Sequence, residues 1–430
     1  PISAQGLVSS SLQFVDNLIV GRLGETALAT LGLSSQMFFI FYMILYGFTG
    51  GTVTYMSQFF GARDIVNVKR VIGITEAIAM SVGILFFIAT AFFPRYVLHI
   101  FTNISVIHEI GEPFIRLASL IFLTWAIVMP LQAALRATQQ TAIPFKISII
   151  VFSTNTFLGI VLVYGFFGFP RCGIMGACYG ILISRLLELS LYIIVIFGKK
   201  NLIAGKIKEY FSWEKELFKK VISNAIPTTV NELLWGAGFS MYNAAYGRIS
   251  VTAFAAAQAG TTIMNIIAMA CFAIGDATLI LVGEKLGEGK KNEAYKMASR
   301  ILKMTIVVGL IAGGLLALTS KPIISLFDFT PLGESYTFKI MMILSVTLAV
   351  KIFNAAIITG VLRAGGDTKF AMFTEAGVVW GIGVPIAFIT SLYFHFPIHL
   401  AVLCVQLEEI TKFFIVFHRF RSRKWVNTLV

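Results

Sequence analysis

The sequence predicts an all-α integral membrane protein with twelve transmembrane helices in two parallel six-helix lobes. Two observations support this prediction. First, 57% of the 430 residues are hydrophobic and only 13% are charged, whereas soluble domains carry roughly 25% charged residues. Most of the surface is therefore expected to meet lipid. Second, short motifs of the first half recur in the second half at one nearly constant offset, which divides the chain into two equivalent halves.

Apolar stretches close to the ~20 residues of a spanning helix recur along the whole chain. We expect spans at residues 1–20, 28–57, 71–94, 112–136, 143–166, 174–198, 218–246, 252–283, 301–320, 336–362, 370–393 and 397–418. The first span is expected to lack its start, because the chain opens on Pro1 without a methionine, and no cleavable signal peptide is visible. The expected organisation is an N-terminal six-helix lobe at 1–198, a cytoplasmic linker at 199–217 and a C-terminal six-helix lobe at 218–430.

The internal repeat is visible in short polar motifs. Gly21-Arg22 recurs as Gly247-Arg248, and Leu135-Arg136-Ala137 recurs as Leu362-Arg363-Ala364, so the two pairs of motifs keep the same offset to within one position. Six helices per repeat is an even number, so both halves enter the membrane in the same orientation. Their pseudo-two-fold axis is then expected to run along the membrane normal, with a central cavity between halves that rock in alternating access.

Lys and Arg residues are distributed unevenly between the two sets of gaps. The alternate gaps that begin with 58–70, together with the C-terminus, hold 25 of them, and the opposite gaps hold seven. The positive-inside rule therefore places both termini on the cytoplasmic side of the membrane. The net charge of +13 lies in these short gaps and not on a folded polar face, so we expect no nucleic-acid partner.

Several motifs share their order and spacing with one transporter family. They lie at residues 15–24, 58–62, 165–170, 173–177, 231–235 and 362–368. With them the sequence resembles, nearly end to end, a bacterial transporter of the multidrug and toxic compound extrusion (MATE) family. The resemblance implies export of organic, often cationic, compounds in exchange for Na⁺ or H⁺. From this resemblance we expect a monomer in the lipid bilayer of a bacterial or archaeal inner (plasma) membrane, and it is expected to use no cofactor beyond the coupling ion.

Family members place an ion site in one of two regions. One site combines an Asp in helix one, an Asn and an Asp in helix five, and a Thr in helix six. Asp16 and Asn155 match the first two positions, but Gly159 and Ile181 stand at the others. The alternative site centres on a helix-seven glutamate, which Glu232 matches as a possible Na⁺ ligand.

That alternative site is incomplete in this sequence. An Asp that some members carry in helix ten has no clear counterpart here, and Asn354 is the nearest polar residue.

Carboxylates inside the expected spans are the main candidates for coupling. A charged side chain at the bilayer centre costs about 2.5–3.5 kcal/mol, so it usually faces a cavity or a partner. Glu232 follows Pro227 by five residues, and the proline can free carbonyl groups for a cation. We expect Glu232 to bind the coupling ion or a proton; the alternative is a hydrogen bond that serves packing alone.

Three further glutamates, Glu375, Glu408 and Glu409, could form an acidic pocket with Glu232. Glu408 also precedes Lys412 by four residues, the spacing of a helical ion pair, so a structural role remains open.

The sequence allows two roles for Asp16 in the first span. It binds protons or ions or lines the substrate path, or it anchors Asn155 or a break in the backbone. The expected substrate cavity draws on polar, aromatic and thioether side chains at helix centres, with packing or lipid contact as the alternative for each. They are Gln36, Asn155, Trp235, Tyr242, Asn243, Gln258, Asn265, Asn354 and Met264.

Two other classes of protein compete with the antiporter. A flippase for lipid-linked sugars or peptidoglycan precursors would line its cavity with several basic residues. Our charge count assigns only Arg185 and Lys351 to the membrane interior, whereas seven carboxylates are candidates there: Asp16, Glu188, Glu232, Asp276, Glu375, Glu408 and Glu409. A membrane enzyme would need a nucleophile or a metal constellation, and the sequence contains neither, so we expect no enzyme activity. The sequence leaves the exported compound and the choice between Na⁺ and H⁺ open.

Overall fold

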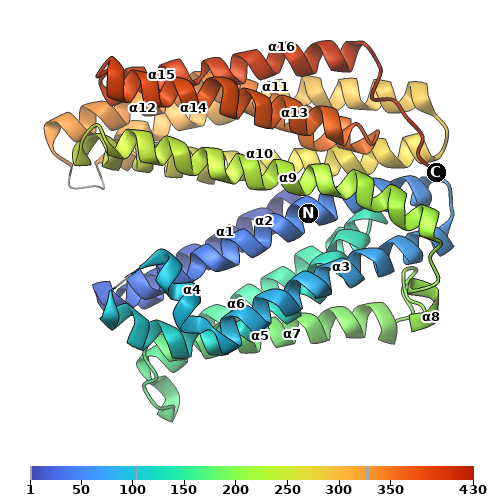
Figure 1. The fold of residues 1–430 in the computed structure, drawn as a ribbon, viewed down its shortest axis with the longest axis horizontal. Coiled ribbons are helices and arrows are strands. Elements are labelled where there is room, and N and C mark those ends of the chain that lie inside the picture. The colour runs from blue at the N-terminus through green and yellow to red at the C-terminus, as the bar shows by residue number, and fades with distance from the viewer. Residues whose placement is uncertain (1, 103, 326–328) are drawn as a thin grey trace. The chain divides into compact units, whose positions relative to one another are not determined.

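The computed structural model describes residues 2–102, 104–325 and 329–430, and every regular element in that part of the chain is a helix. The helices form two compact units, each described here by itself. Unit 1 contains the residues up to Met56 and Asp64–Ile222, and unit 2 contains Ser57–Arg63 and Ser223–Val430. Figure 1 shows that the long helices within each unit run side by side.

Unit 1 is built around two helix pairs, α3 with α5 and α6 with α7, and α1 packs on α6. Its core holds the buried rings of Phe41, Phe114 and Phe122. The elements in chain order are α1 (Ile2–Gly21), α2 (Glu25–Gly61), α3 (Ile65–Phe92), α4 (Pro94–Phe101), α5 (Ser105–Ala137), α6 (Ala142–Tyr164), η1 (Phe166–Gly168), α7 (Ile174–Ile193), η2 (Ile194–Gly198) and α8 (Ile207–Tyr210).

Unit 2 packs α10, α11 and α12 against one another through small residues. A Cβ atom added to Gly309 of α11 would lie 2.6 Å from the Cα of Ala349 on α12, and one added to Gly313 would meet the carbonyl of Ser345. Small residues allow this close approach between helices in a membrane. The elements are α9 (Lys215–Gly247), α10 (Val251–Gly287), α11 (Lys291–Ile324), α12 (Pro331–Ala355), η3 (Ala356–Leu362), α13 (Thr368–Val378), η4 (Val379–Gly383), α14 (Val384–Phe388), η5 (Ile389–Tyr393), α15 (Ile398–Val405) and α16 (Leu407–Arg421).

Nine of the helices in the described residues are long and apolar enough to cross a membrane. Three more segments, α1, α9 and the pair α15–α16, bring the count to the twelve predicted from the sequence. All three segments carry acidic residues, namely Asp16 in α1, Glu232 in α9 and the Glu408–Glu409 pair in α16. Acidic residues in membrane helices usually face the interior of the bundle, so these three segments point to the site.

The helix boundaries preserve the internal repeat. Both α2 and α10 have 37 residues, and their first residues, Glu25 and Val251, are related by the offset of the sequence repeat. Left-handed backbone conformations recur with the same spacing to within one position, at Arg63 and Gly289 and again at Gln139 and Gly366. The two halves are thus built from the same local turns. Their superposition by rotation about the membrane normal stays a prediction, and Pro1, expected to overlie Pro227, lies outside the described residues.

A close helix crossing explains why the last turn of α2 belongs to unit 2. A Cβ atom on Gly61 would collide with the backbone carbonyl of Glu284, and a Cβ atom on Gly287 would collide with that of Gln58. The Gln58 amide also donates to the carbonyl of Ala364 at 2.7 Å, and its Oε1 accepts the backbone N–H of Leu429 at 2.7 Å. The crossing is reciprocal because residues 58–61 at the end of α2 and residues 284–287 at the end of α10 are equivalent positions of the internal repeat.

The segment expected as a linker contains the short helix α8, which packs on α3. Lys69 Nζ lies 2.8 Å from Glu209 Oε2, and the hydrogen bond and charge of Lys69 lower the pKa of Glu209. Burial raises the pKa of Tyr210 to about 12, and its O–H donates to the carbonyl of Ile203 at 2.6 Å. The linker is therefore fixed to unit 1 up to Tyr210.

Candidate functional site

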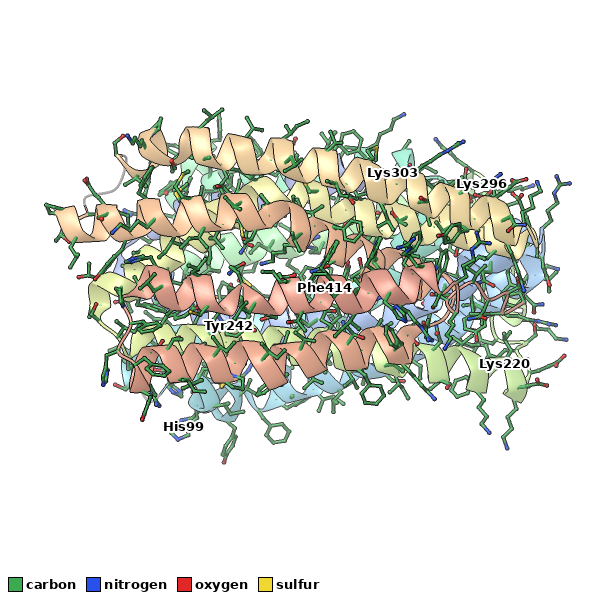
Figure 2. All side chains as sticks on the ribbon, turned by 90° about the horizontal axis from the view of Figure 1, so that it is seen from above. His99, Lys220, Tyr242, Lys296, Lys303 and Phe414 are labelled. Atoms are coloured by element: carbon green, nitrogen blue, oxygen red, sulfur yellow. The ribbon has the colours of Figure 1, made fainter. Side chains whose placement is uncertain are left out.

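Four carboxylates lie in the interior of unit 2 on three helices. Glu232 belongs to α9, Glu375 to α13, and Glu408 and Glu409 to α16. Glu232 is 8% exposed and Glu408 is 5% exposed. Figure 2 places Tyr242, the hydrogen-bond partner of Glu408, away from the end of unit 2 that carries Lys296 and Lys220. The structure thus brings together the four glutamates for which the sequence suggested a common pocket.

Glu232 forms a buried ion pair with Arg363. Arg363 Nη2 donates to Glu232 Oε1 at 2.5 Å, and the arginine side chain is only 2% exposed. Arg363 follows the π-helical segment η3 directly, and such segments often occur at functional sites. The partner of Glu232 is therefore a basic side chain and not a polar neighbour such as the predicted cavity residues Gln258, Asn265 or Asn354. Such a pair favours the alternative in which Glu232 serves packing, and its coupling role stays a prediction.

Lys412 is the second buried cation of this region. Its Nζ lies 2.5 Å from Glu408 Oε1 and 3.3 Å from Glu409 Oε1, and its side chain is 3% exposed. The predicted helical pair between Glu408 and Lys412 is confirmed. The sequence count nevertheless assigned Arg363 to a cytoplasmic gap and Lys412 to the C-terminal group, although the expected span 397–418 includes Lys412. The structure buries both side chains and so corrects that count. We name Glu232, Arg363, Glu375, Glu408, Glu409 and Lys412 the charge cluster.

Neutral side chains hold three of the four carboxylates in place. Asn231 Nδ2 donates to Glu375 Oε2 at 2.6 Å, Asn354 Nδ2 donates to Glu409 Oε2 at 2.9 Å, and the Tyr242 O–H donates to Glu408. The Oδ1 atoms of Asn231 and Asn354 are buried and have no hydrogen-bond partner in the described residues. Two acceptor oxygens inside the cluster are therefore open to a donor or to a cation.

Backbone geometry makes room for these contacts. A Cβ atom added to Gly383 in η4 would collide with Glu408 Oε2 and with the Tyr242 hydroxyl. On α9, the helix continues through Pro227, and the hydroxyls of Thr228 and Thr229 both donate to the carbonyl of Ala225. Glu232 is thereby presented from a continuous helix.

The charge cluster has an excess of negative charge. Four carboxylates face two basic groups, Arg363 and Lys412, which leaves two formal negative charges when all groups are ionised. Lys351 on α12 also interacts electrostatically with Glu409, and Lys412 interacts with Glu375. Buried charges are stable only when they are paired and hydrogen-bonded. An excess of carboxylates therefore favours the uptake of a further cation or a proton.

Unit 1 holds a smaller polar group around Asp16. Asn155 Nδ2 donates to Asp16 Oδ1 at 2.7 Å, and Ser184 Oγ donates to Asn155 Oδ1 at 3.2 Å. Asp16 thus contacts Asn155, as one of the two sequence readings expected. Gly159 lies in the same helix as Asn155 and offers no side-chain oxygen, so this group has fewer oxygen ligands than the resemblance would require of an ion site.

A second ion pair lies close to the Asp16 group. Arg185 Nη1 is 2.6 Å from Glu188 Oε2, and the guanidinium lies over the Trp125 ring at 5.0 Å. A small pocket beside this pair is lined by the polar side chains of Gln5, Gln132, Ser148, Arg185 and Glu188. The Arg185 charge is therefore already balanced within unit 1.

The remaining predicted cavity residues are more scattered. Met264 is 2% exposed within the apolar core of unit 2, which suits packing. Gln36 and Trp235 are exposed, whereas Asn243, Gln258 and Asn265 are partly buried. Of the predicted cavity residues, Asn155, Tyr242 and Asn354 contact a buried carboxylate. The parts the sequence did not assign to the site are Arg363, Asn231, Ser184 and Gly383. Across the described ranges, no group of three or more His, Cys, Asp or Glu is placed to hold a metal ion.

A two-unit bundle of membrane-length helices with acidic residues in the interior of each unit defines a membrane transporter. The MatE family model matches residues 1–161 and 227–389, and the chain belongs to this family. The starts of the two matched segments, at positions 1 and 227, are related by the offset of the internal repeat. Proteins of this family are transporters of the multidrug efflux type.

Curated relatives cover nearly the whole chain. It is 26% identical to the "Uncharacterized transporter YisQ" of Bacillus subtilis over 96% of this chain and 90% of that protein. It is 24% identical to the "Probable multidrug resistance protein YoeA" of Bacillus subtilis (91% and 85%) and 22% identical to the "Probable multidrug resistance protein NorM" of Thermotoga maritima (100% and 92%).

Solved structures share the fold. A MATE crystal structure in the straight conformation superposes with a TM-score of 0.89 at 16% identity, covering 98% of this chain and 94% of that one. The bent form of the Vibrio cholerae MATE transporter VcmN gives a TM-score of 0.87 at 15% identity, covering 99% and 96%.

Proposed function

We propose that this protein is a secondary antiporter that exports organic, cationic compounds in exchange for Na⁺ or H⁺ by alternating access. In the same proposal both termini lie in the cytoplasm. The family and the names of the multidrug-resistance relatives support an export function. The observation that supports cation coupling is the charge cluster of unit 2, with its two formal negative charges in excess.

Coupling requires that the cation bind the outward-facing and the inward-facing conformations with different affinities. A ligand can shift a conformational equilibrium only through its different affinities for the two states. The charge cluster supplies such a difference when one face presents the carboxylates to the outside and the other to the cytoplasm. Because Glu232, Glu375 and Glu408 come from separate helices, small helix shifts would change their spacing and hence their affinity for a cation.

The flippase alternative is not favoured by the family match, but the count of basic residues used against it needs a correction. The structure buries Arg363 and Lys412 in addition to Arg185, so the spans hold more cations than the sequence suggested. Each of these three nevertheless pairs with a carboxylate, namely Glu232, Glu408 and Glu188. Their charges are therefore committed to internal pairs and not presented to a pyrophosphate group.

The test is efflux from right-side-out or reconstituted vesicles loaded with a fluorescent organic cation. An outward-to-inward Na⁺ gradient and a proton gradient are imposed separately, at equal ionic strength and with the membrane potential clamped. We expect efflux with at least one gradient and none when both are collapsed. Efflux that is independent of both gradients, or that is absent for a panel of organic cations, would overturn the proposal.

A further inference from the structure

The charge cluster contains its own cation at the position where a coupling ion would be expected. Lys412 Nζ bridges Glu408 and Glu409 at 2.5 and 3.3 Å. Its side chain is 3% exposed, so protein and not water surrounds the ammonium group. The lysine thus occupies the space between two of the four carboxylates.

We propose that Lys412 is a tethered counter-ion that holds the cation position of the charge cluster and excludes Na⁺, so that H⁺ is the coupling cation. This inference rests on the proposed antiport function and specifies its ion. It concerns a residue that determines specificity, because Lys412 touches the carboxylates that bind the coupling cation.

The first argument is the tether. Lys412 follows Glu408 by four residues and Glu409 by three on the same helix, α16, and these spacings place the three side chains on one helix face. A covalently attached partner competes at a high effective concentration that does not depend on the salt of the medium. Na⁺ must therefore displace an ammonium group that cannot diffuse away.

The second argument is the cost of displacement. If Na⁺ bound between Glu408 and Glu409, the ammonium of Lys412 would be left buried and unpaired, which is strongly unfavourable. Glu375 of α13 also attracts Lys412, but it is already held by Asn231. A proton avoids this conflict, because it adds to a carboxylate oxygen without occupying the lysine's place.

The third argument comes from the two unsatisfied amide oxygens. Asn231 Oδ1 and Asn354 Oδ1 are buried acceptors without a donor in the described residues, and both asparagines are 2% exposed. Each amide is bonded to a carboxylate, Glu375 or Glu409. A carboxyl group that gains a proton becomes an O–H donor and could satisfy such an oxygen.

The surrounding charges are consistent with proton uptake at this position. Around Lys412 and its two partners lie Glu375 on α13, Lys351 and Asn354 on α12, and Tyr242 on α9. Glu375 in turn interacts with Glu232 on α9 and with Arg363 after η3. One proton taken up from outside would neutralise one carboxylate and leave Lys412 charged. The same proton is released to the cytoplasm after the change of face, so that one H⁺ crosses per cycle and the ammonium keeps its own protons.

The experiment measures ²²Na⁺ binding and the melting temperature of the purified full chain in detergent. NaCl is titrated against choline chloride at constant ionic strength. Lys412→Ala opens space for an ion, Lys412→Arg keeps the charge, and Lys351→Ala is the control for loss of a nearby lysine that does not bridge the pair. We expect no saturable Na⁺ binding in the wild type, Lys412→Arg or Lys351→Ala. We expect at least tenfold greater binding in Lys412→Ala, with a melting temperature that rises with NaCl.

Saturable Na⁺ binding by the wild type, or a folded Lys412→Ala protein that binds no Na⁺, would overturn the inference. If Lys412→Ala does not fold, the paired variant Glu408→Gln/Lys412→Ala, which removes one charge of each sign, replaces it with the same expected outcomes. Binding is read without transport. A protein that exports no organic cation would therefore refute the proposed function, while the Na⁺ measurement would still decide the role of Lys412.

Discussion

Arg363 Nη2 lies 2.5 Å from Glu232 Oε1 in the interior of unit 2, and both side chains are largely removed from solvent. Glu232, which the family resemblance indicated as the coupling residue, is therefore paired with Arg363. Arg363 directly follows η3 and belongs to Leu362-Arg363-Ala364, the second copy of the repeated motif Leu135-Arg136-Ala137. Removing one partner of a buried ion pair leaves the other uncompensated, which typically costs about 3–5 kcal/mol.

The first prediction follows from this pair. Arg363→Gln should lower the stability of the folded protein by about 3–5 kcal/mol, because Glu232 then has no basic partner. The double variant Glu232→Gln/Arg363→Gln should recover most of that loss. Thermal unfolding of the single and double variants in detergent measures the difference. Equal losses in the single and double variants would show that the pair contributes through packing alone.

A second prediction concerns the close contact of Gly383 with the Glu408 carboxylate. Gly383→Ala should displace the Glu408 carboxylate from the Tyr242 hydroxyl, because its Cβ atom would collide with both. Overpacking of this kind costs about 1–3 kcal/mol. Gly381→Ala in the same π-helical segment is the matched control, since a Cβ atom there meets nothing within 4 Å. A melting temperature that falls equally in both variants would contradict the assignment.

The reciprocal crossing of α2 and α10 gives a third prediction. Gly287→Ala should destabilise unit 2 by about 1–3 kcal/mol, because its Cβ atom would meet the backbone carbonyl of Gln58 and backbone cannot yield as a side chain can. Gly314→Ala on α11 serves as the control, with nothing within 4 Å of its added Cβ atom. The melting temperatures of the two variants, compared with the wild type, measure the effect. An unchanged melting temperature in Gly287→Ala would show that the two helix ends do not cross so closely.

The fourth prediction is a pH dependence at α8. Lys69 lowers the pKa of Glu209 below its ordinary value of 4.5. A lowered pKa in the folded state means that the pair stabilises the linker fully above pH 4.5 and is lost as the pH falls through the lowered value. A spin label at Lys208→Cys should therefore gain mobility as the pH drops below that range. In the Glu209→Gln background the label should already be mobile at neutral pH; a rigid label there would count against the pair.

The topology offers a fifth prediction. Lys208 should face the cytoplasm, and Arg248 and His395 should face outward. The count of 25 against seven basic residues becomes 23 against seven when the buried Arg363 and Lys412 are removed, so the direction of the bias is unchanged. Single cysteines at 248 and 395, but not at 208, should react with an impermeant thiol reagent in intact cells. Labelling at position 208 would show that the predicted orientation is wrong.

Much of the fold could be predicted from the sequence because the membrane imposes length and apolarity on each span. Gly61 and Gly287 are separated by the offset of the internal repeat, but the backbone contact that a glycine permits at each position is seen only in the structure. The short helix α4 was not predicted: the sequence analysis left residues 95–111 as a gap, whereas the structure has Pro94–Phe101 and then begins α5 at Ser105. Hydropathy identifies the membrane-spanning part of a helix, but it does not show where helical turns continue beyond the membrane. It therefore missed α4 and the first turns of α5.

The site was predicted less completely, and for a physical reason. Hydropathy places Arg363 and Lys412 with the charged ends of helices, because Lys369 follows the one and Arg419 the other. Their burial becomes visible only in the structure, where each side chain contacts a carboxylate inside unit 2. Glu232 and Arg363 lie far apart in the sequence, so no sequence motif indicates that they pair. The pair between Glu408 and Lys412 did leave one, in its four-residue spacing, but the spacing does not say whether the helix face meets lipid, water or other helices.

The central claim is that the carboxylates of the charge cluster couple export to a cation gradient, and Glu232→Gln tests it most directly. Gradient-driven efflux of an organic cation from vesicles is compared in the wild type, Glu232→Gln and Glu232→Gln/Arg363→Gln, with the amount of folded protein matched by size-exclusion chromatography. We predict that efflux falls at least tenfold in both variants, because the double variant restores the balance of charge but not the carboxylate. Efflux at the wild-type rate in the folded double variant would contradict a coupling role for Glu232.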